Sequence, residues 1–242
     1  MDSRLSNEIE HGKKLASEGA ESIWNWGSPA GMARAERRAA YFVSTGKITA
    51  SDKVLELGCG TGLFTRKVYA STKAHIIATD LSEELLQEAR LKFPEGDFRV
   101  ADAMKLDFPD NTFDVVFGSS ILHHLDMDKS LNEIFRVLKK DGRMVFAEPN
   151  MINPQILIQK NIPFIKKWLG DSPDETAIVR WSFKKKMMDH GFKNVNIFPY
   201  DFLHPSVMKA LIPIVDSIGK TVEKIPVLKE IAGSVIIYAE KP

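Results

Sequence analysis

Short apolar runs alternate with longer amphipathic segments through the middle of the chain. Each apolar run has the length of a buried strand, and each longer segment has the spacing of a helix with one apolar face. Because the runs have no polar face, the alternation predicts a mainly parallel sheet covered by helices on both sides. The strands are expected at 53–57, 75–79, 97–100, 113–118 and 143–147, and the helices between them at 62–70, 82–92 and 128–139.

The chain before this alternation is predicted to be helical. One helix is expected within 12–26 and a second at 30–45, where Ser28 has the chemistry of an N-cap and Pro29 suits the first turn. We interpret residues 1–50 as an N-terminal helical cap.

The pattern changes again after residue 149. Residues 151–169 are apolar but contain helix-breaking prolines, and residues 206–223 are apolar on nearly every face, so we expect the latter to be buried. The other predicted elements are a helix at 174–190 and strands at 194–200 and 234–239. We therefore predict an α/β domain over 51–242, with insertions that cover the substrate at about 151–175 and 201–232.

The segment Val54–Gly62 carries the strongest chemical signal. It predicts a strand that runs into a turn with glycines at 58, 60 and 62, where the backbone can approach a ligand closely. Asp80 ends the next strand, where a carboxylate can bind ribose hydroxyls. A dinucleotide-binding fingerprint would place its third glycine at the position of Leu63, so the spacing argues against a nicotinamide dehydrogenase.

These residues closely resemble the first motif of class I S-adenosylmethionine (SAM) methyltransferases. Segments 101–103, 113–120 and 136–143 match later motifs of that family in the right order, so the resemblance covers roughly residues 50 to 150. It implies a Rossmann-like, doubly wound, seven-stranded sheet whose last strand is antiparallel and lies between the fifth and sixth. It also implies SAM as cofactor and S-adenosylhomocysteine (SAH) as product. In similar methyltransferases the N-terminal helices often close over the cofactor, so the resemblance makes Trp24 and Trp26 candidates for a lid, with packing within the cap as the alternative. The cofactor-binding residues implied by the resemblance are Glu56, Gly58, Cys59, Gly60, Thr61, Gly62, Asp80, Leu81, Asp102, Ala103, Ser119 and His124.

Candidate catalytic residues follow the fourth predicted strand. His123 and His124 are placed where this fold presents side chains to cofactor and substrate, and an imidazole suits a general base near neutral pH. The alternative is structural, with one ring capping the next helix and the other packing on the sheet. We expect Cys59 to be a small residue in a tight loop and to have no covalent role. Ligands of such sheets bind at the carboxyl ends of the strands, where Glu148 also falls.

Composition narrows the class of partner. The net charge is +1, which argues against a broad nucleic-acid-binding face. Cys59 is the only cysteine, so we expect no disulfide and a reducing compartment. Cysteine and histidine residues do not cluster at metal-ligand spacing, so we expect no metal site. The first eight residues are polar, unlike a signal peptide, and no apolar run approaches the length that spans a bilayer. We predict a cytoplasmic protein.

The methyl acceptor is less well defined. Residues 118–121 lack the Asp/Asn-Pro-Pro-aromatic segment of enzymes that methylate amino groups of bases and glutamine, so we predict a small-molecule acceptor. We favour O-methylation over C- or N-methylation, on a lipid-, quinone- or saccharide-like molecule. The apolar residues of 151–169 and 199–231 are suited to binding a hydrophobic acceptor or to weak contact with a membrane surface. The alternative is that they form a subdomain core or a homodimer interface. Methylation of a macromolecule, and SAM binding without transfer, remain the other hypotheses.

Overall fold

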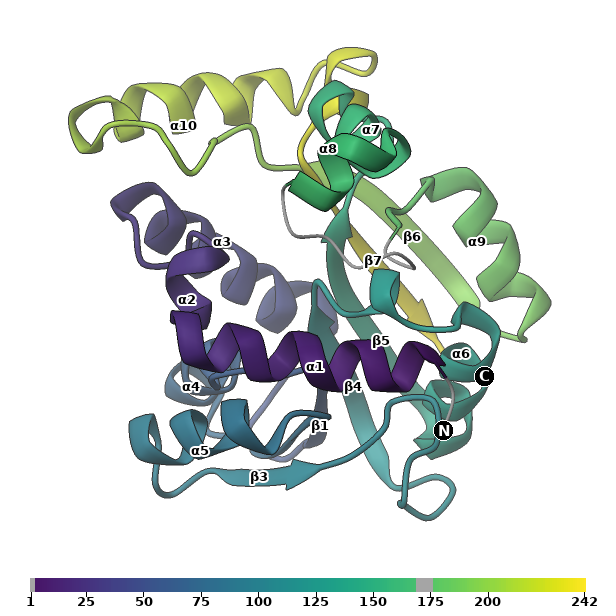
Figure 1. Cartoon of the computed structure of the whole chain (residues 1–242). Coiled ribbons are helices and arrows are strands. Elements are labelled where there is room, and N and C mark those ends of the chain that lie inside the picture. Colours follow the sequence, from purple (N-terminus) through teal and green to yellow (C-terminus); the bar gives the residue numbers. More distant parts are fainter. Residues whose placement is uncertain (1–2, 169–175) are drawn as a thin grey trace.

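A seven-stranded sheet forms the centre of the protein, with the strand order β3-β2-β1-β4-β5-β7-β6 (Figure 1). The computed structural model describes residues 3–168 and 176–242. Its strands are β1 (Lys53–Leu57), β2 (His75–Asp80), β3 (Asp97–Val100), β4 (Phe113–Ser119), β5 (Leu138–Pro149), β6 (Lys193–Tyr200) and β7 (Ser234–Glu240). The first five are parallel, and β7 runs antiparallel between β5 and β6. The predicted fold class is confirmed.

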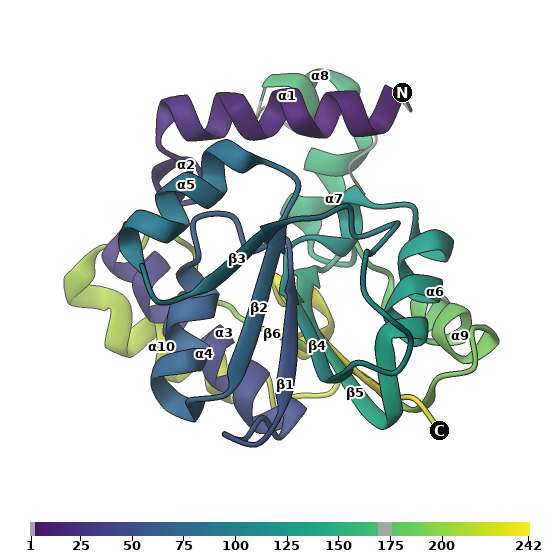
Figure 2. The ribbon, with the colours of Figure 1, turned by 90° about the horizontal axis from the view of Figure 1, so that it is seen from below.

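Helices cover both faces of this sheet. In the described part of the chain they are α1 (Ser3–Glu18), α2 (Ala20–Ile23), α3 (Pro29–Gly46), α4 (Leu63–Thr72), α5 (Glu83–Lys92), α6 (Met127–Val137), α7 (Pro154–Asn161), α8 (Pro163–Trp168), α9 (Arg180–Asp189) and α10 (Ile212–Val222). Short 3-10 turns lie at η1 (Leu122–His124), η2 (Lys209–Leu211) and η3 (Leu228–Ile231). Figure 2 shows the sheet between α3 and α4 on one side and α6 and α9 on the other.

Two apolar cores hold these layers together. Leu131 and Ile134 of α6 pack with Leu55 and Phe146 of the sheet on one face. On the opposite face, Phe42 of α3 packs with strand residues such as Val54, Phe117 and Val145. Successive residues of a strand point to opposite faces, so apolar residues on the two faces of β1, β4 and β5 supply both cores.

Polar caps start several helices where the sequence indicates. The Ser28 hydroxyl accepts a 2.9 Å hydrogen bond from the Gly31 amide, with Pro29 as the first residue of α3. Ser82 caps α5 in the same way through the Leu85 amide. The predicted Ser28 cap is confirmed. The N-terminal helical prediction needs one adjustment, because Gly19 adopts a left-handed φ of 84° and separates α1 from α2.

The predicted helix at 174–190 is wrong in its first part. Helix α9 begins at Arg180, because Ile178 forms a parallel bridge with Asn150 and buries its side chain in the core. Asp174 lies outside the described residues. The predicted helix at 128–139 also ends early, at Val137, because β5 begins at Leu138.

The expectation that 206–223 is buried is wrong. Ile214 and Ile218 of α10 are each 58% exposed, and Met208 before the helix is 68% exposed. Helix α10 lies at the periphery of the molecule in Figure 1 and contacts it closely through Gly219, which packs on Phe202. Part of the sequence that is apolar enough for a core therefore faces outward.

No helix in the part of the chain that the structure describes has both the length and the apolar character needed to cross a membrane.

This distribution of burial predicts opposite effects for two substitutions. Leu131→Ala removes a fully buried side chain from α6 and should lower the free energy of unfolding by about 2–5 kcal/mol. Ile218→Ala on the exposed face of α10 should change it by no more than about 0.5 kcal/mol. Urea denaturation followed by circular dichroism measures both, and a large loss for Ile218→Ala would show that α10 is covered in solution.

Candidate functional site

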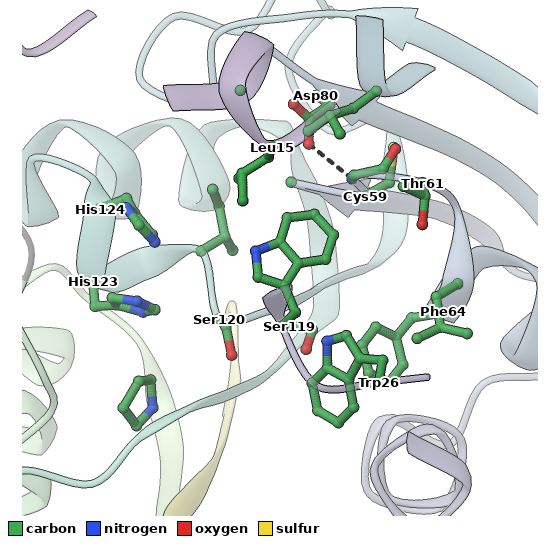
Figure 3. Close-up of a pocket in the computed structure, with 18 of the residues that line it drawn as sticks. Leu15, Trp26, Cys59, Thr61, Phe64, Asp80, Ser119, Ser120, His123 and His124 are labelled. Atoms are coloured by element: carbon green, nitrogen blue, oxygen red, sulfur yellow. Dashed lines mark hydrogen bonds between the residues drawn. The ribbon is translucent and has the colours of Figure 1, made fainter. Parts of the chain in front are cut away.

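A cavity of about 660 Å³ opens at the carboxyl ends of β1, β2 and β4, within the usual size range of small-molecule sites. The glycine loop after β1 and the residues after β4 line it from the sheet, and α1, α2 and α7 supply further lining residues (Figure 3). The predicted site residues that the structure brings together here are Gly58, Cys59, Gly60, Thr61, Asp80, Leu81, Asp102, Ala103, Ser119, His123 and His124.

The glycine loop is shaped by backbone conformations that favour glycine. Gly58, Gly60 and Gly62 have φ values of 65°, 51° and 74°, all in the left-handed region. A Cβ on Gly60 would lie 2.8 Å from the ring of Trp24, and one on Gly58 would lie 2.6 Å from Ile121. The loop is therefore a surface that larger residues would block.

Asp80 connects the end of β2 to this loop. One carboxylate oxygen accepts the Gly60 amide at 2.8 Å and the other accepts the Ser82 amide at 2.9 Å. Loss of hydration raises the pKa of Asp80, while these amide hydrogen bonds act in the opposite direction. Each carboxylate oxygen retains acceptor capacity, as the binding of a ribose diol requires.

Asp102 lies beyond the end of β3 and also lines the cavity. Its carboxylate accepts the Met104 amide at 2.8 Å, which fixes a tight turn around Ala103. Asp102 therefore has a structural role in this turn. The same turn places Asp102 and Ala103 in the lining of the cavity. Their contact with an adenine ring stays a prediction.

Glu56 and Gly62 do not line the cavity. The Glu56 side chain is buried beneath the loop, where its carboxyl group accepts a hydrogen bond from the Thr65 hydroxyl. Burial, together with the nearby Asp80 charge, raises the pKa of Glu56 to about 8. Glu56 therefore packs beneath the loop and binds Thr65 of α4. Its direct contact with a cofactor stays a prediction.

Cys59 is almost completely buried. Burial raises the pKa of its thiol well above the usual value, so the sulfur stays protonated and is a poor nucleophile. This environment agrees with the expectation that Cys59 has no covalent role.

The buried carboxylate of Glu148 orients His123. The sequence placed Glu148 at the end of a strand but did not indicate this contact. Glu148 is fully buried at the end of β5, and its Oε2 lies 2.6 Å from Nδ1 of His123. Its Oε1 accepts the amides of Ile121 and Leu122 at 3.0 and 2.9 Å. The carboxylate thus fixes both the η1 turn and the ring orientation of His123, and Nε2 is the ring nitrogen that does not face Glu148.

His124 lies beside His123, with ring centroids 4.2 Å apart, and both rings border the cavity (Figure 3). His124 is also close enough to Asp80 for its charge to lower the pKa of that carboxyl group. It therefore lies between the predicted cofactor residue and the predicted base.

The N-terminal helices close the cavity from the outside. Trp24 and Trp26 both line it, and Trp26 packs edge-on against Phe64 of α4 with ring centroids 5.5 Å apart. Glu21 of α2 fastens this cover to the glycine loop, since its carboxylate accepts the Thr61 hydroxyl at 2.7 Å. The structure shows that Trp26 packs on α4, and a lid role for the two tryptophans stays a prediction.

Arg38 is a lining residue that motif reasoning missed. It comes from α3, is 3% exposed, and reaches the hydroxyl groups of Ser119 and Ser120 after β4. The three arginines of α3 (Arg34, Arg37 and Arg38) lie among small and aromatic residues, which indicated that one of them could reach the site. The sequence does not reveal which one points into the cavity.

Comparison with known proteins gives consistent matches. Residues 55–146 match the methyltransferase domain family model. A demethylmenaquinone methyltransferase of Lactobacillus johnsonii is 32% identical over 62% of this chain and 72% of its own length. An uncharacterized methyltransferase-like protein of Schizosaccharomyces pombe is 31% identical over 62% of this chain, which spans 57% of that relative's length. A SAM-dependent methyltransferase structure from Archaeoglobus fulgidus has a TM-score of 0.60 at 20% identity and covers 87% of this chain and 94% of its own.

The chain belongs to the class I SAM-dependent methyltransferase family. The cofactor of that family is SAM, and the residues present here fit it. The backbone of the glycine loop at Gly58 and Gly60 borders the cavity, and Asp80 offers acceptors at the end of β2.

Asp80→Ala should weaken SAH binding by about 1–3 kcal/mol, because the ribose acceptors and the anchor of the Gly60 amide are lost together. Asp80→Asn, which keeps one acceptor oxygen, should fall between this variant and the wild type. Isothermal titration calorimetry measures the affinities, with the exposed Asp107→Ala as control. Unchanged affinity in Asp80→Ala would reject the ribose assignment.

Glu56→Gln should change how stability depends on pH. Because the folded-state pKa of Glu56 is about 8 and its usual value is 4.5, the folded protein binds this proton more tightly than the unfolded chain. Glu56 therefore lowers stability progressively as the pH rises through that window. Relative to wild type, the variant should gain about 1 kcal/mol per pH unit there.

Urea denaturation of the ligand-free protein at several pH values between 5 and 8 tests this, with the exposed Glu95→Gln as control. Parallel stability curves for wild type and Glu56→Gln would show that the Glu56 carboxyl group is ionised at neutral pH.

Proposed function

We propose that this protein transfers a methyl group from SAM to a small, largely apolar acceptor that carries an ionisable hydroxyl group. The observation that carries this proposal is the continuity of the cavity, in which the glycine loop, Asp80 and His123 face a common space. Bound SAM supplies an electrophilic methyl group on its positively charged sulfur. Transfer then depends mainly on holding the acceptor close to that group and on excluding water.

The cofactor would be held by the loop and by acids on neighbouring strands. The loop backbone at Gly58 and Gly60 would border its chain, Asp80 would accept from the ribose hydroxyls, and Asp102 with Ala103 would border the adenine ring. Trp24 and Trp26 line this region and would help to exclude water from the reacting groups. These assignments rest on the placement of the side chains around the cavity and on the family resemblance.

His123 is our candidate for the general base. It would take the hydroxyl proton of the acceptor through Nε2, and the adjacent Glu148 carboxylate would stabilise the resulting imidazolium. His124, between His123 and Asp80, would position the acceptor beside the cofactor. A carboxylate that orients a histidine from behind is a common support for proton transfer, and it favours His123 over His124 as the base.

An apolar aromatic acceptor suits the rest of the lining. Leu15, Ile23, Trp24 and Trp26 enter from the N-terminal helices, and Ile156 enters from α7. The name of the Lactobacillus relative points to a quinone-type acceptor as well. A quinol loses a hydroxyl proton before either oxygen or ring carbon attacks the methyl group, so the same base serves O- and C-methylation. We retain O-methylation as the prediction and treat C-methylation as its direct competitor.

The wider setting of the reaction is also part of the proposal. The exposed apolar side chains on α7 and α10 (Leu157, Ile158, Ile214 and Ile218) suit weak contact with a membrane surface or with a second copy of the chain. Their exposure argues against the alternative of a subdomain core. The cytoplasmic setting and the lack of a nucleic-acid partner stay predictions.

The decisive experiment measures SAH release from SAM with a reduced naphthoquinol that carries a short isoprenoid chain. Product analysis by mass spectrometry and NMR would assign the new methyl group to oxygen or carbon. Release of SAH with this acceptor supports the proposal. SAM binding without release for any hydroxylated aromatic acceptor would favour a binding module without transfer activity.

His123→Gln should lower kcat by about 100-fold or more while leaving SAH affinity nearly unchanged, because the variant loses the base but not the cofactor contacts. Glu148→Gln should give a smaller loss. The exposed His75→Gln serves as the matched control and should retain full activity. Full turnover in His123→Gln at saturating acceptor would reject the assignment.

A further inference from the structure

Arg38 has an environment unlike that of its neighbours on α3. Arg34 pairs with the Asp201 carboxylate at 2.7 Å, and Arg37 pairs with Glu223. Among the residues that the structure describes, Arg38 forms no such ion pair, although its side chain is the most deeply buried of the three. A buried positive charge is costly unless an anion compensates it, so this arrangement requires an explanation.

Hydroxyl groups surround the Arg38 guanidinium instead. Its nitrogen atoms donate to Tyr200, Ser119, Ser120 and Ser234 at 2.9, 2.8, 3.0 and 3.1 Å. These oxygens satisfy its hydrogen-bonding geometry but carry no net charge. Serine hydroxyls can also donate to an incoming anion while they accept from the guanidinium.

Aromatic rings enclose the same group. The guanidinium carbon of Arg38 lies 5.0 Å from the centre of the Trp26 ring and 6.0 Å from that of Phe64. Such rings favour a cation and keep water away, which strengthens any charge interaction made there. Arg38, Ser119, Ser120 and Ser234 all line the cavity, so this protected charge is accessible to a ligand.

The sheet order places this group opposite Asp80. Asp80 ends β2 on one side of β1, whereas Ser119 ends β4 on the other side, and Ser234 begins β7 beyond β5. The glycine loop after β1 lies between them. A ligand with its ribose at Asp80 would extend across this loop toward Arg38 with the end that carries the amino acid.

We propose that Arg38, with the hydroxyl groups of Ser119, Ser120 and Ser234, binds a carboxylate of the bound ligand. The carboxylate of the cofactor's amino-acid end is the first source, and an acid group on the acceptor is the second. This inference rests on the proposed function for the orientation of the cofactor. It adds a charged contact at the end of the cavity where the family motifs quoted above place only glycines and Ser119.

The test compares SAH with S-adenosyl-3-thiopropylamine, which is SAH without its carboxylate. By calorimetry, wild type should bind SAH about 10- to 100-fold more tightly than this analogue, as expected for one buried charge-assisted contact. In Arg38→Met the two affinities should agree within about twofold, while the affinity for the analogue stays close to that of wild type. Arg37→Met, altered next to Arg38 but outside the cavity lining, should keep the wild-type ratio.

A second titration distinguishes the two sources. SAH-saturated wild type and Arg38→Met are titrated with 1,4-dihydroxy-2-naphthoate and with its methyl ester. If Arg38→Met keeps the preference for SAH but loses a preference for the free acid over the ester, the carboxylate belongs to the acceptor. If Arg38→Met changes neither preference, the proposal is overturned.

Thermal unfolding of each variant shows whether it is folded before titration. If Arg38→Met does not fold, Arg38→Lys provides the same test. This variant keeps the positive charge but lacks the planar guanidinium group. It should reduce the preference for SAH over the analogue without abolishing it. Failure of wild type to bind SAH would instead count against the proposed function, so the two failures are separable.

Discussion

The hydrogen bond from the Gly60 amide to the Asp80 carboxylate is the contact on which the site depends. It joins the loop after β1 to the end of β2 and holds Gly60 in its left-handed conformation. The parallel pairing of β1 with β2 and β4 brings the ends of these strands to one edge, which makes this bond possible. The shape of the loop and the orientation of the Asp80 oxygens both depend on this contact between the two strand ends.

A second buried carboxylate organises the other half of the cavity. Glu148 has two backbone amides and one imidazole as partners, and together they fix the η1 turn that carries both histidines. The two halves have different electrostatic character. Asp80 places a carboxylate at the end of β2, whereas Arg38 places a positive charge near the end of β4, so the cavity has two ends of unlike charge.

Sequence patterns were sufficient to predict the sheet and the glycine loop, because both depend on local signals. The apolar runs specify β1 and β4, and the glycine spacing specifies the turn after β1. Arg38 and Glu148 could not be assigned in the same way, since their partners lie far away in the chain: Arg38 meets Ser234, and Glu148 meets His123. Helix α10 was misjudged for a related reason. Apolar composition indicates that a surface avoids water, but it does not identify what covers that surface.

The close approach of Trp24 to Gly60 makes the two positions interdependent. A side chain at 60 would require both tolerance of a left-handed φ and space that the indole ring now fills. A smaller residue at 24 would open that space but also uncover the loop. Among relatives of this chain, the residues at these two positions are therefore expected to change together, and a variant of either one alone gives an incomplete measure of what the pair contributes.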